Sequence, residues 1–243
     1  ATRSGAGLVS LAAPRSLNGI FAGALVEVMT EPLRDNAAEG LESLSDDDWR
    51  RLLERKDAVL IGPGIGVNPA TQNMLRWLLR NLHLPWVIDA DGLNTVALEV
   101  ERLRHAKVPP VLTPHPGEMA RLTGKSTAAV NADRAQIARS FAVEHRCHLV
   151  LKGARTVIAT ADGKVFINPT GNPGMASGGM GDVLAGILVA LLGQGLAPED
   201  AMQLGVYLHG FAGDTVAEAN GGIGLIPSDL ITALPSSLRA LAD

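Results

Sequence analysis

A glycine-rich segment between Gly171 and Asp182 holds the residues best suited to chemistry. It reads Gly-Asn-Pro-Gly-Met-Ala-Ser-Gly-Gly-Met-Gly-Asp, and an apolar run long enough for a helix follows at once. Glycines let backbone N–H groups turn inward, and a helix N-terminus adds the positive end of its dipole. The segment therefore predicts an anion site of the kind that binds a phosphate.

Asp182, the last residue of that segment, has two interpretations. A carboxylate beside an anion site can act as a base that takes a proton from a substrate hydroxyl. Aspartate is also a common N-cap, which accepts hydrogen bonds from the free N–H groups of a helix. The spacing of the segment alone favours neither interpretation.

Four more polar motifs each follow a short apolar segment. They are Gly62-Pro63-Gly64-Ile65-Gly66, Asp89-Ala90-Asp91-Gly92-Leu93-Asn94, Thr113-Pro114-His115-Pro116-Gly117-Glu118 and Lys152-Gly153-Ala154-Arg155-Thr156. In an open parallel sheet, ligands bind beyond the carboxyl ends of the strands. If the apolar segments are parallel strands, these motifs and the glycine-rich segment converge on a single cleft.

Two of these motifs also have a simpler explanation. Asp89 and Asp91 offer the carboxylates that Mg²⁺ prefers, but they can equally cap the next helix. His115, held between two prolines, suits either a ligand contact or an ordinary surface loop. Lys152 leaves an apolar strand and needs a partner, for which a phosphate is suitable.

Strands and helices alternate along the chain, which predicts a parallel sheet covered on both faces. The predicted strands are Leu8–Ala12, Ala58–Ile61, Trp86–Asp89, Val111–Thr113, His148–Lys152, Thr156–Ala159 and Lys164–Asn168. The predicted helices include Ala70–Asn81, Ala132–Glu144, Val183–Leu192 and Pro198–Asn220. The sequence Asp162-Gly163 favours a tight reversing turn, so the sheet should have an antiparallel portion late in the chain.

The composition excludes several classes of protein. With 243 residues, of which 47% are hydrophobic, one large domain over residues 1–243 is expected. A net charge of −4 argues against a nucleic-acid binder, and no stretch predicts a transmembrane helix or a leader peptide. The single cysteine, Cys147, rules out an internal disulfide and fits a buried structural thiol in a cytoplasmic protein. The sequence lacks a Walker A motif, zinc-ligand spacing and a Gly-x-Ser-x-Gly elbow.

In order and spacing, the four motifs and Gly178-Gly179-Met180-Gly181-Asp182-Val183-Leu184 resemble the ADP- or ATP-dependent NAD(P)H-hydrate dehydratases of the ribokinase-like superfamily. The resemblance extends from near Ser4 to about Leu234, and His209-Gly210 and Ala212-Gly213-Asp214 also fit it. It implies a three-layer α/β/α sandwich with a mostly parallel central sheet. It also implies a lyase of metabolite repair, in which a nucleotide phosphorylates the C6 hydroxyl of hydrated NADH or NADPH and phosphate then leaves.

The resemblance also implies roles for individual residues. Gly66, His115 and Asp182 would contact the hydrated dinucleotide, with Asp182 as the catalytic base. The nucleotide, ADP or ATP, would be held by Lys152, Gly153, Ala154, Arg155, Thr156 and Gly181. Mg²⁺ would neutralise its phosphates, with no protein ligand assigned, and members of the superfamily often form homo-oligomers.

The chain departs from the family pattern at its start. The first strand and a glycine-rich turn that contributes an alanine to the substrate site are expected before Ser4-Gly5-Ala6-Gly7, and the sequence does not contain them. Two other functions stay open at this point. One is a ribokinase-like kinase that phosphorylates the hydroxymethyl group of a vitamin precursor, and the other is a nucleotide-binding protein without activity.

Overall fold

A six-stranded sheet forms the centre of the protein, for which a computed structural model describes residues 1–36 and 40–242. The strands lie in the order β10-β9-β8-β7-β6-β5. They are β5 (Val59–Ile61), β6 (Trp86–Ile88), β7 (Val111–Leu112), β8 (His148–Leu151), β9 (Val157–Ala159) and β10 (Val165–Ile167). β5 to β8 are parallel, whereas β9 runs antiparallel to both β8 and β10. The predicted mostly parallel sheet with a late antiparallel portion is confirmed.

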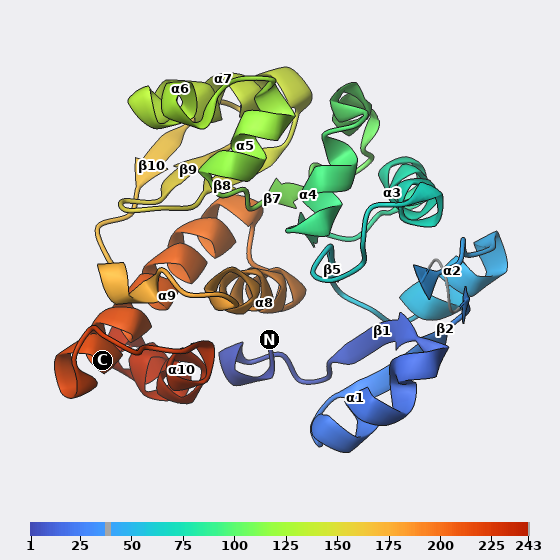
Figure 1. The fold of residues 1–243 in the computed structure, drawn as a ribbon, viewed down its shortest axis with the longest axis horizontal. Helices are drawn as coiled ribbons and strands as arrows, with labels where there is room; N and C mark the ends of the chain where they lie inside the picture. The colour runs from blue at the N-terminus through green and yellow to red at the C-terminus, as the bar shows by residue number, and fades with distance from the viewer. Residues whose placement is uncertain (37–39, 243) are drawn as a thin grey trace.

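Helices cover both faces of this sheet (Figure 1). One layer contains α3 (Pro69–Asn81), α4 (Asp91–Val96), α5 (Pro116–Thr123), α6 (Thr127–Ala132) and α7 (Arg134–His145). The other contains α8 (Met180–Gly193), α9 (Pro198–Asn220) and α10 (Pro227–Ala242). Side chains alternate along each strand, so Ile88 packs on the first layer and Val87 on the second. The architecture is therefore the three-layer α/β/α sandwich that the resemblance implies.

The chain before β5 forms a smaller substructure, which Figure 1 shows beside the main sheet. β1 (Ser10–Pro14) pairs in parallel with β2 (Met29–Leu33) in a separate two-stranded sheet. The predicted strand Leu8–Ala12 thus lies two residues too early, and β2 was not predicted because Glu31 and Pro32 interrupt its apolar pattern. The remaining elements are α1 (Asn18–Ala24), β3 (Asp35–Asn36), β4 (Gly40–Leu41), α2 (Asp46–Leu53) and four short 3₁₀ helices, Thr2–Ser4, Arg15–Leu17, Val100–His105 and Pro173–Met175.

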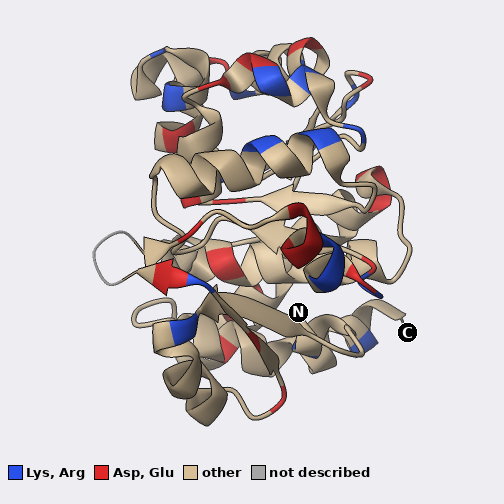
Figure 2. Ribbon diagram, turned by 90° about the vertical axis from the view of Figure 1, so that its right-hand side faces the viewer, with Lys and Arg blue, Asp and Glu red and all other residues tan. Residues whose placement is uncertain are grey.

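The distribution of charge, the helices and the burial of the cysteine can be compared with what the composition predicts. Figure 2 shows positions of both signs interspersed over the molecule, so the ribbon gives no sign of a broad basic face. Across the described ranges, no helix is both long enough and apolar enough to cross a membrane. The thiol of Cys147 is fully buried, and burial raises its pKa, which confirms the predicted structural thiol.

His209 on α9 contacts the start of α8, where the glycine-rich segment ends. Its Nε2 lies 3.0 Å from the carbonyl oxygen of Met180, the first residue of α8. Burial lowers the pKa of His209 to about 4, so the ring is neutral near pH 7 and Nε2–H can donate to that carbonyl.

We expect this histidine to make the protein less stable in mild acid. Between pH 6.5 and about 4 the unfolded chain binds a proton at His209 and the folded chain does not. The free energy of unfolding should therefore fall over this range, by about 3 kcal/mol from His209 alone. Urea unfolding at several pH values, with His209→Gln as the comparison, measures the difference. Parallel pH profiles for the two proteins would contradict it.

Candidate active site

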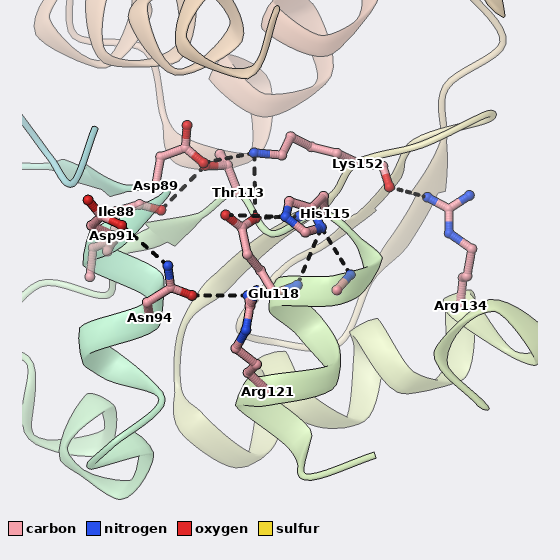
Figure 3. Close-up of polar contacts among 11 residues, drawn as sticks. Ile88, Asp89, Asp91, Asn94, Thr113, His115, Glu118, Arg121, Arg134 and Lys152 are labelled. Atoms are coloured by element: carbon pink, nitrogen blue, oxygen red, sulfur yellow. Dashed lines mark hydrogen bonds and ion pairs between the residues drawn. The ribbon is translucent and has the colours of Figure 1, made fainter. Parts of the chain in front are cut away.

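The carboxyl ends of β6, β7 and β8 meet around one lysine (Figure 3). Lys152 Nζ lies 2.8 Å from Asp89 Oδ1 and 3.8 Å from Glu118 Oε2. Asp89 follows β6 and is only 1% exposed, while Glu118 lies in the first turn of α5, just beyond β7. The predicted convergence of these strand-end motifs is therefore confirmed, and a buried ion pair lies at its centre.

The glycine-rich segment reaches the same ion pair through Gly181, the second residue of α8. A Cβ added at Gly181 would lie 3.1 Å from Lys152 Nζ and 3.8 Å from Asp89 Oδ2. The absence of a side chain thus lets the helix N-terminus approach the lysine closely. This approach joins the anion site predicted from the glycine-rich segment to the strand-end motifs.

Asp182 is the third residue of α8 and does not cap it. The N-cap is Gly179, in the left-handed conformation at φ 87°, and no side chain caps this helix, so the capping interpretation is wrong. Asp182 is solvent-exposed and, among the described residues, accepts no hydrogen bond from another side chain. Partial desolvation and then the negative charge of Asp89 raise its pKa, against the opposing effect of Lys152. This carboxylate is accessible and free to accept a proton.

His115 is fixed by the start of α5, for which it is the N-cap. Its Nδ1 accepts from the backbone N–H of Gly117 at 3.0 Å and of Glu118 at 3.4 Å, and Glu118 Oε2 accepts from the N–H of His115 at 2.7 Å. The ring is half-exposed, and because Nδ1 accepts, the proton of the neutral ring lies on Nε2. His115 Nε2 lies 3.6 Å from Glu118 Oε1, so the ring is oriented toward the same carboxylate that faces Lys152.

The ends of β5 and β6 are packed so closely that only glycine fits at position 62. A Cβ there would lie 1.7 Å from the carbonyl oxygen of Asp89. Ala90, the next residue and the N-cap of α4, adopts φ 50° and ψ −120°, a strained conformation for a residue with a side chain. Asp91 Oδ2 accepts from the N–H of Gly66 at 3.0 Å. Neither Asp89 nor Asp91 caps α4, so that alternative is wrong for both.

Three residues that sequence reasoning did not single out hold the site together. Glu118 completes the capping box of α5. Asp214 on α9 accepts from the N–H of Gly171 at 2.8 Å and from the side chain of Asn172 at 2.9 Å, which anchors the start of the glycine-rich segment. Arg134 binds the backbone around Lys152. A cation at the first position of a helix opposes the helix dipole, and this was the one signal in the sequence for Arg134.

The carboxylates of the site decide whether a divalent ion could bind there. The described part of the chain contains no cluster of three or more His, Cys, Asp or Glu side chains arranged to hold a metal. The carboxylates of Asp89 and Glu118 both face the ammonium of Lys152, and Asp182 lies close enough to feel the charges of Asp89 and Lys152. This donor set fits an Mg²⁺ ion that arrives with nucleotide phosphates, because Mg²⁺ often takes only one or two protein carboxylates.

The sandwich and the glycine-rich entry into α8 define a ribokinase-like α/β protein. Residues 1–236 match the NAD(P)H-hydrate dehydratase family, and the chain belongs to that family. It is 47% identical over 243 residues to the bifunctional NAD(P)H-hydrate repair enzyme Nnr of Moorella thermoacetica. That alignment covers all of this chain and 46% of the relative, so the chain spans about half the length of such bifunctional relatives.

A second relative and a solved structure have a single activity in their names. The ADP-dependent (S)-NAD(P)H-hydrate dehydratase of Neisseria meningitidis is 36% identical over 200 residues, which are 80% of this chain and 68% of the relative. The ADP/ATP-dependent NAD(P)H-hydrate dehydratase of Bacillus subtilis, co-crystallised with ATP and Mg²⁺, superposes with a TM-score of 0.80 at 28% identity. That superposition covers 99% of this chain and 81% of the Bacillus chain.

Proposed function

We propose that this chain, as one ribokinase-like domain over residues 1–243, uses ADP or ATP to dehydrate hydrated NADH and NADPH. The observation that carries the proposal is the position of Asp182, accessible and without a hydrogen-bond donor, beside Lys152 and the N-terminus of α8. Family membership and the two single-activity relatives support the choice of substrate.

Asp182 takes the proton of the C6 hydroxyl as that oxygen attacks the terminal phosphorus of the nucleotide. The new O–P bond forms while the bond to the departing AMP or ADP breaks. Hydroxide is a poor leaving group and phosphate a good one, so the C6–O bond of the phosphorylated ring then breaks. Loss of a proton from C5 restores the C5–C6 double bond of the working cofactor.

We assign the remaining residues to binding. The N-terminus of α8 at Gly181 and the ammonium of Lys152 would hold the transferring phosphoryl group, and Gly153 to Thr156 would hold the rest of the nucleotide. His115 and Gly66 would contact the hydrated dinucleotide, His115 through Nε2–H. Mg²⁺ bound with the nucleotide would supply charge neutralisation, facing the carboxylates of Asp89 and Asp182.

The proposal also covers the compartment and the oligomeric state of the protein. The single buried thiol supports a reducing compartment such as the cytoplasm. Self-association into a homo-oligomer would cover some of the exposed apolar side chains before β5, among them Leu8, Ile20 and Val26, which are 83%, 68% and 88% exposed.

Incubation of the purified chain with hydrated NADH and either ADP or ATP tests the proposal. We expect the absorbance of reduced nicotinamide to return only when a nucleotide is present, with release of one inorganic phosphate per restored ring. A stable phosphoester product would instead indicate a small-molecule kinase. Nucleotide binding without turnover would indicate a binding protein.

A further inference from the structure

Arg134, the first residue of α7, clamps the chain that leads out of β8. Its Nη2 donates to the carbonyl oxygen of Lys152 at 3.0 Å, as Figure 3 shows, and to that of Leu151 at 2.7 Å. Its Nη1 donates to the carbonyl of Ala154 at 2.6 Å and lies 3.4 Å from that of Arg155. One side chain thus spans the end of β8 and the loop at residues 152–155.

The surroundings of Arg134 are unusual for a cation. Desolvation lowers the pKa of its guanidinium, and its buried Nε has no hydrogen-bond partner in the described part of the chain. It also lies at the positive end of α7, where the helix dipole disfavours a cation. The hydrogen bonds to backbone carbonyls offset the costs of desolvation and of the helix dipole.

The clamp leaves donors of the same loop unused. Within residues 1–36 and 40–242, the N–H groups of Gly153, Ala154 and Arg155 donate to no acceptor, and all three residues are exposed. Gly153 and Arg155 have φ values of 137° and 54°, so the loop is bent away from strand geometry. Free N–H groups on such a bent loop are suited to an anion or to the polar edge of a nucleotide.

We propose that Arg134 is a positioning residue for the nucleotide: by fixing the carbonyls of residues 151, 152, 154 and 155, it holds the loop in the shape whose free N–H groups receive the phosphoryl donor. The proposal rests on the nucleotide-binding role assigned to this loop under the proposed function. In this arrangement Arg134 would touch neither substrate, because both of its Nη groups donate to the backbone and its Nε is buried.

Nucleotide affinity in the absence of hydrated NADH tests this role. The variants are Arg134→Met, which keeps the length and loses the donors, Arg134→Lys, which keeps one donor group, and Arg139→Met. Arg139 lies on the same helix and is exposed, which makes it the matched control. Calorimetric titration with ADP and with ATP gives Kd for each folded variant, and steady-state assays give KM for the nucleotide and for hydrated NADH.

We expect Arg134→Met to weaken nucleotide binding about tenfold or more, because a loop displaced by about an ångström loses its aligned donors. Arg134→Lys should fall between Arg134→Met and wild type, Arg139→Met should match wild type, and KM for hydrated NADH should stay within about twofold. A nucleotide Kd near the wild-type value in Arg134→Met would overturn the proposal, as would equal changes in both KM values. If Arg134→Met does not fold, Arg134→Lys decides the question by the same criteria.

The experiments test the dehydratase activity and the role of Arg134 separately. Wild type that binds ADP or ATP without restoring NADH contradicts the dehydratase, while the Kd comparison still decides the role of Arg134. Wild type that binds neither nucleotide contradicts both.

Discussion

Asp182→Asn should lower nucleotide-dependent restoration of NADH by about 10²-fold or more, because an amide cannot take the hydroxyl proton. The KM values should change little, since the amide keeps the shape of the side chain. In wild type the acidic limb of the rate profile should lie above the ordinary aspartate pKa, because partial desolvation and Asp89 raise the pKa of Asp182. Rates of absorbance recovery measured from acidic to neutral pH test both statements.

Asp200 provides the matched control for this substitution. It is the third residue of α9, as Asp182 is of α8, and it is also exposed. Asp200→Asn should leave the rate unchanged, and both variants should unfold near the wild-type temperature, since Asp182 accepts no hydrogen bond from a described side chain. Near-wild-type turnover in Asp182→Asn would remove Asp182 as the base.

Lys152→Met should damage both stability and nucleotide binding. The ammonium is the ion-pair partner of Asp89, whose carboxylate is 1% exposed and would be left buried without a counter-charge. Breaking a buried pair from one side costs about 3–5 kcal/mol of unfolding free energy. Nucleotide affinity should fall as well, because the ammonium of Lys152, which lies next to Gly181, is proposed to bind the phosphoryl group.

Two further variants separate these effects. Adding Asp89→Asn to Lys152→Met removes the unpaired charge, so the double variant should regain much of the lost unfolding free energy and none of the nucleotide affinity. Lys164→Met breaks an exposed pair with Glu199 and should lower the unfolding free energy far less than Lys152→Met does. Recovery of nucleotide binding in the double variant would show that Lys152 acts only through the fold.

The sequence predicted the main sheet well because its strands carry local signals. Short aliphatic runs with polar strand ends lie at β5 to β8, and Asp162-Gly163 forms the predicted reversal between β9 and β10. The small sheet was harder to predict, since β2 contains Pro32 and joins β1 outside the main sheet. The start of α8 was placed three residues late, at Val183, because the left-handed conformation of Gly179 gives no side-chain signal.

The sequence indicated several residues that lie together in the candidate site, but it did not indicate which of them contact one another. Spacing placed Asp89, Lys152 and Asp182 at the ends of elements, but only the fold shows that a lysine and an aspartate 63 positions apart form an ion pair. Arg134 and Asp214 bind loops that are distant in sequence, so the sequence does not indicate the partners of either side chain. Long-range polar contacts depend on topology, whereas composition and periodicity report on local structure.

The loop at residues 152–156 connects two antiparallel neighbours, β8 and β9, so the core fixes its length. Val157 and Ala159 pack into the apolar cluster on one face of the sheet and Ile158 into that on the other. Inserting a single residue before β9 would exchange these faces unless the loop absorbed it, because side chains alternate along a strand. If this loop binds the nucleotide as proposed, substitutions within it should change the donor preference with less damage to the core than an insertion or deletion.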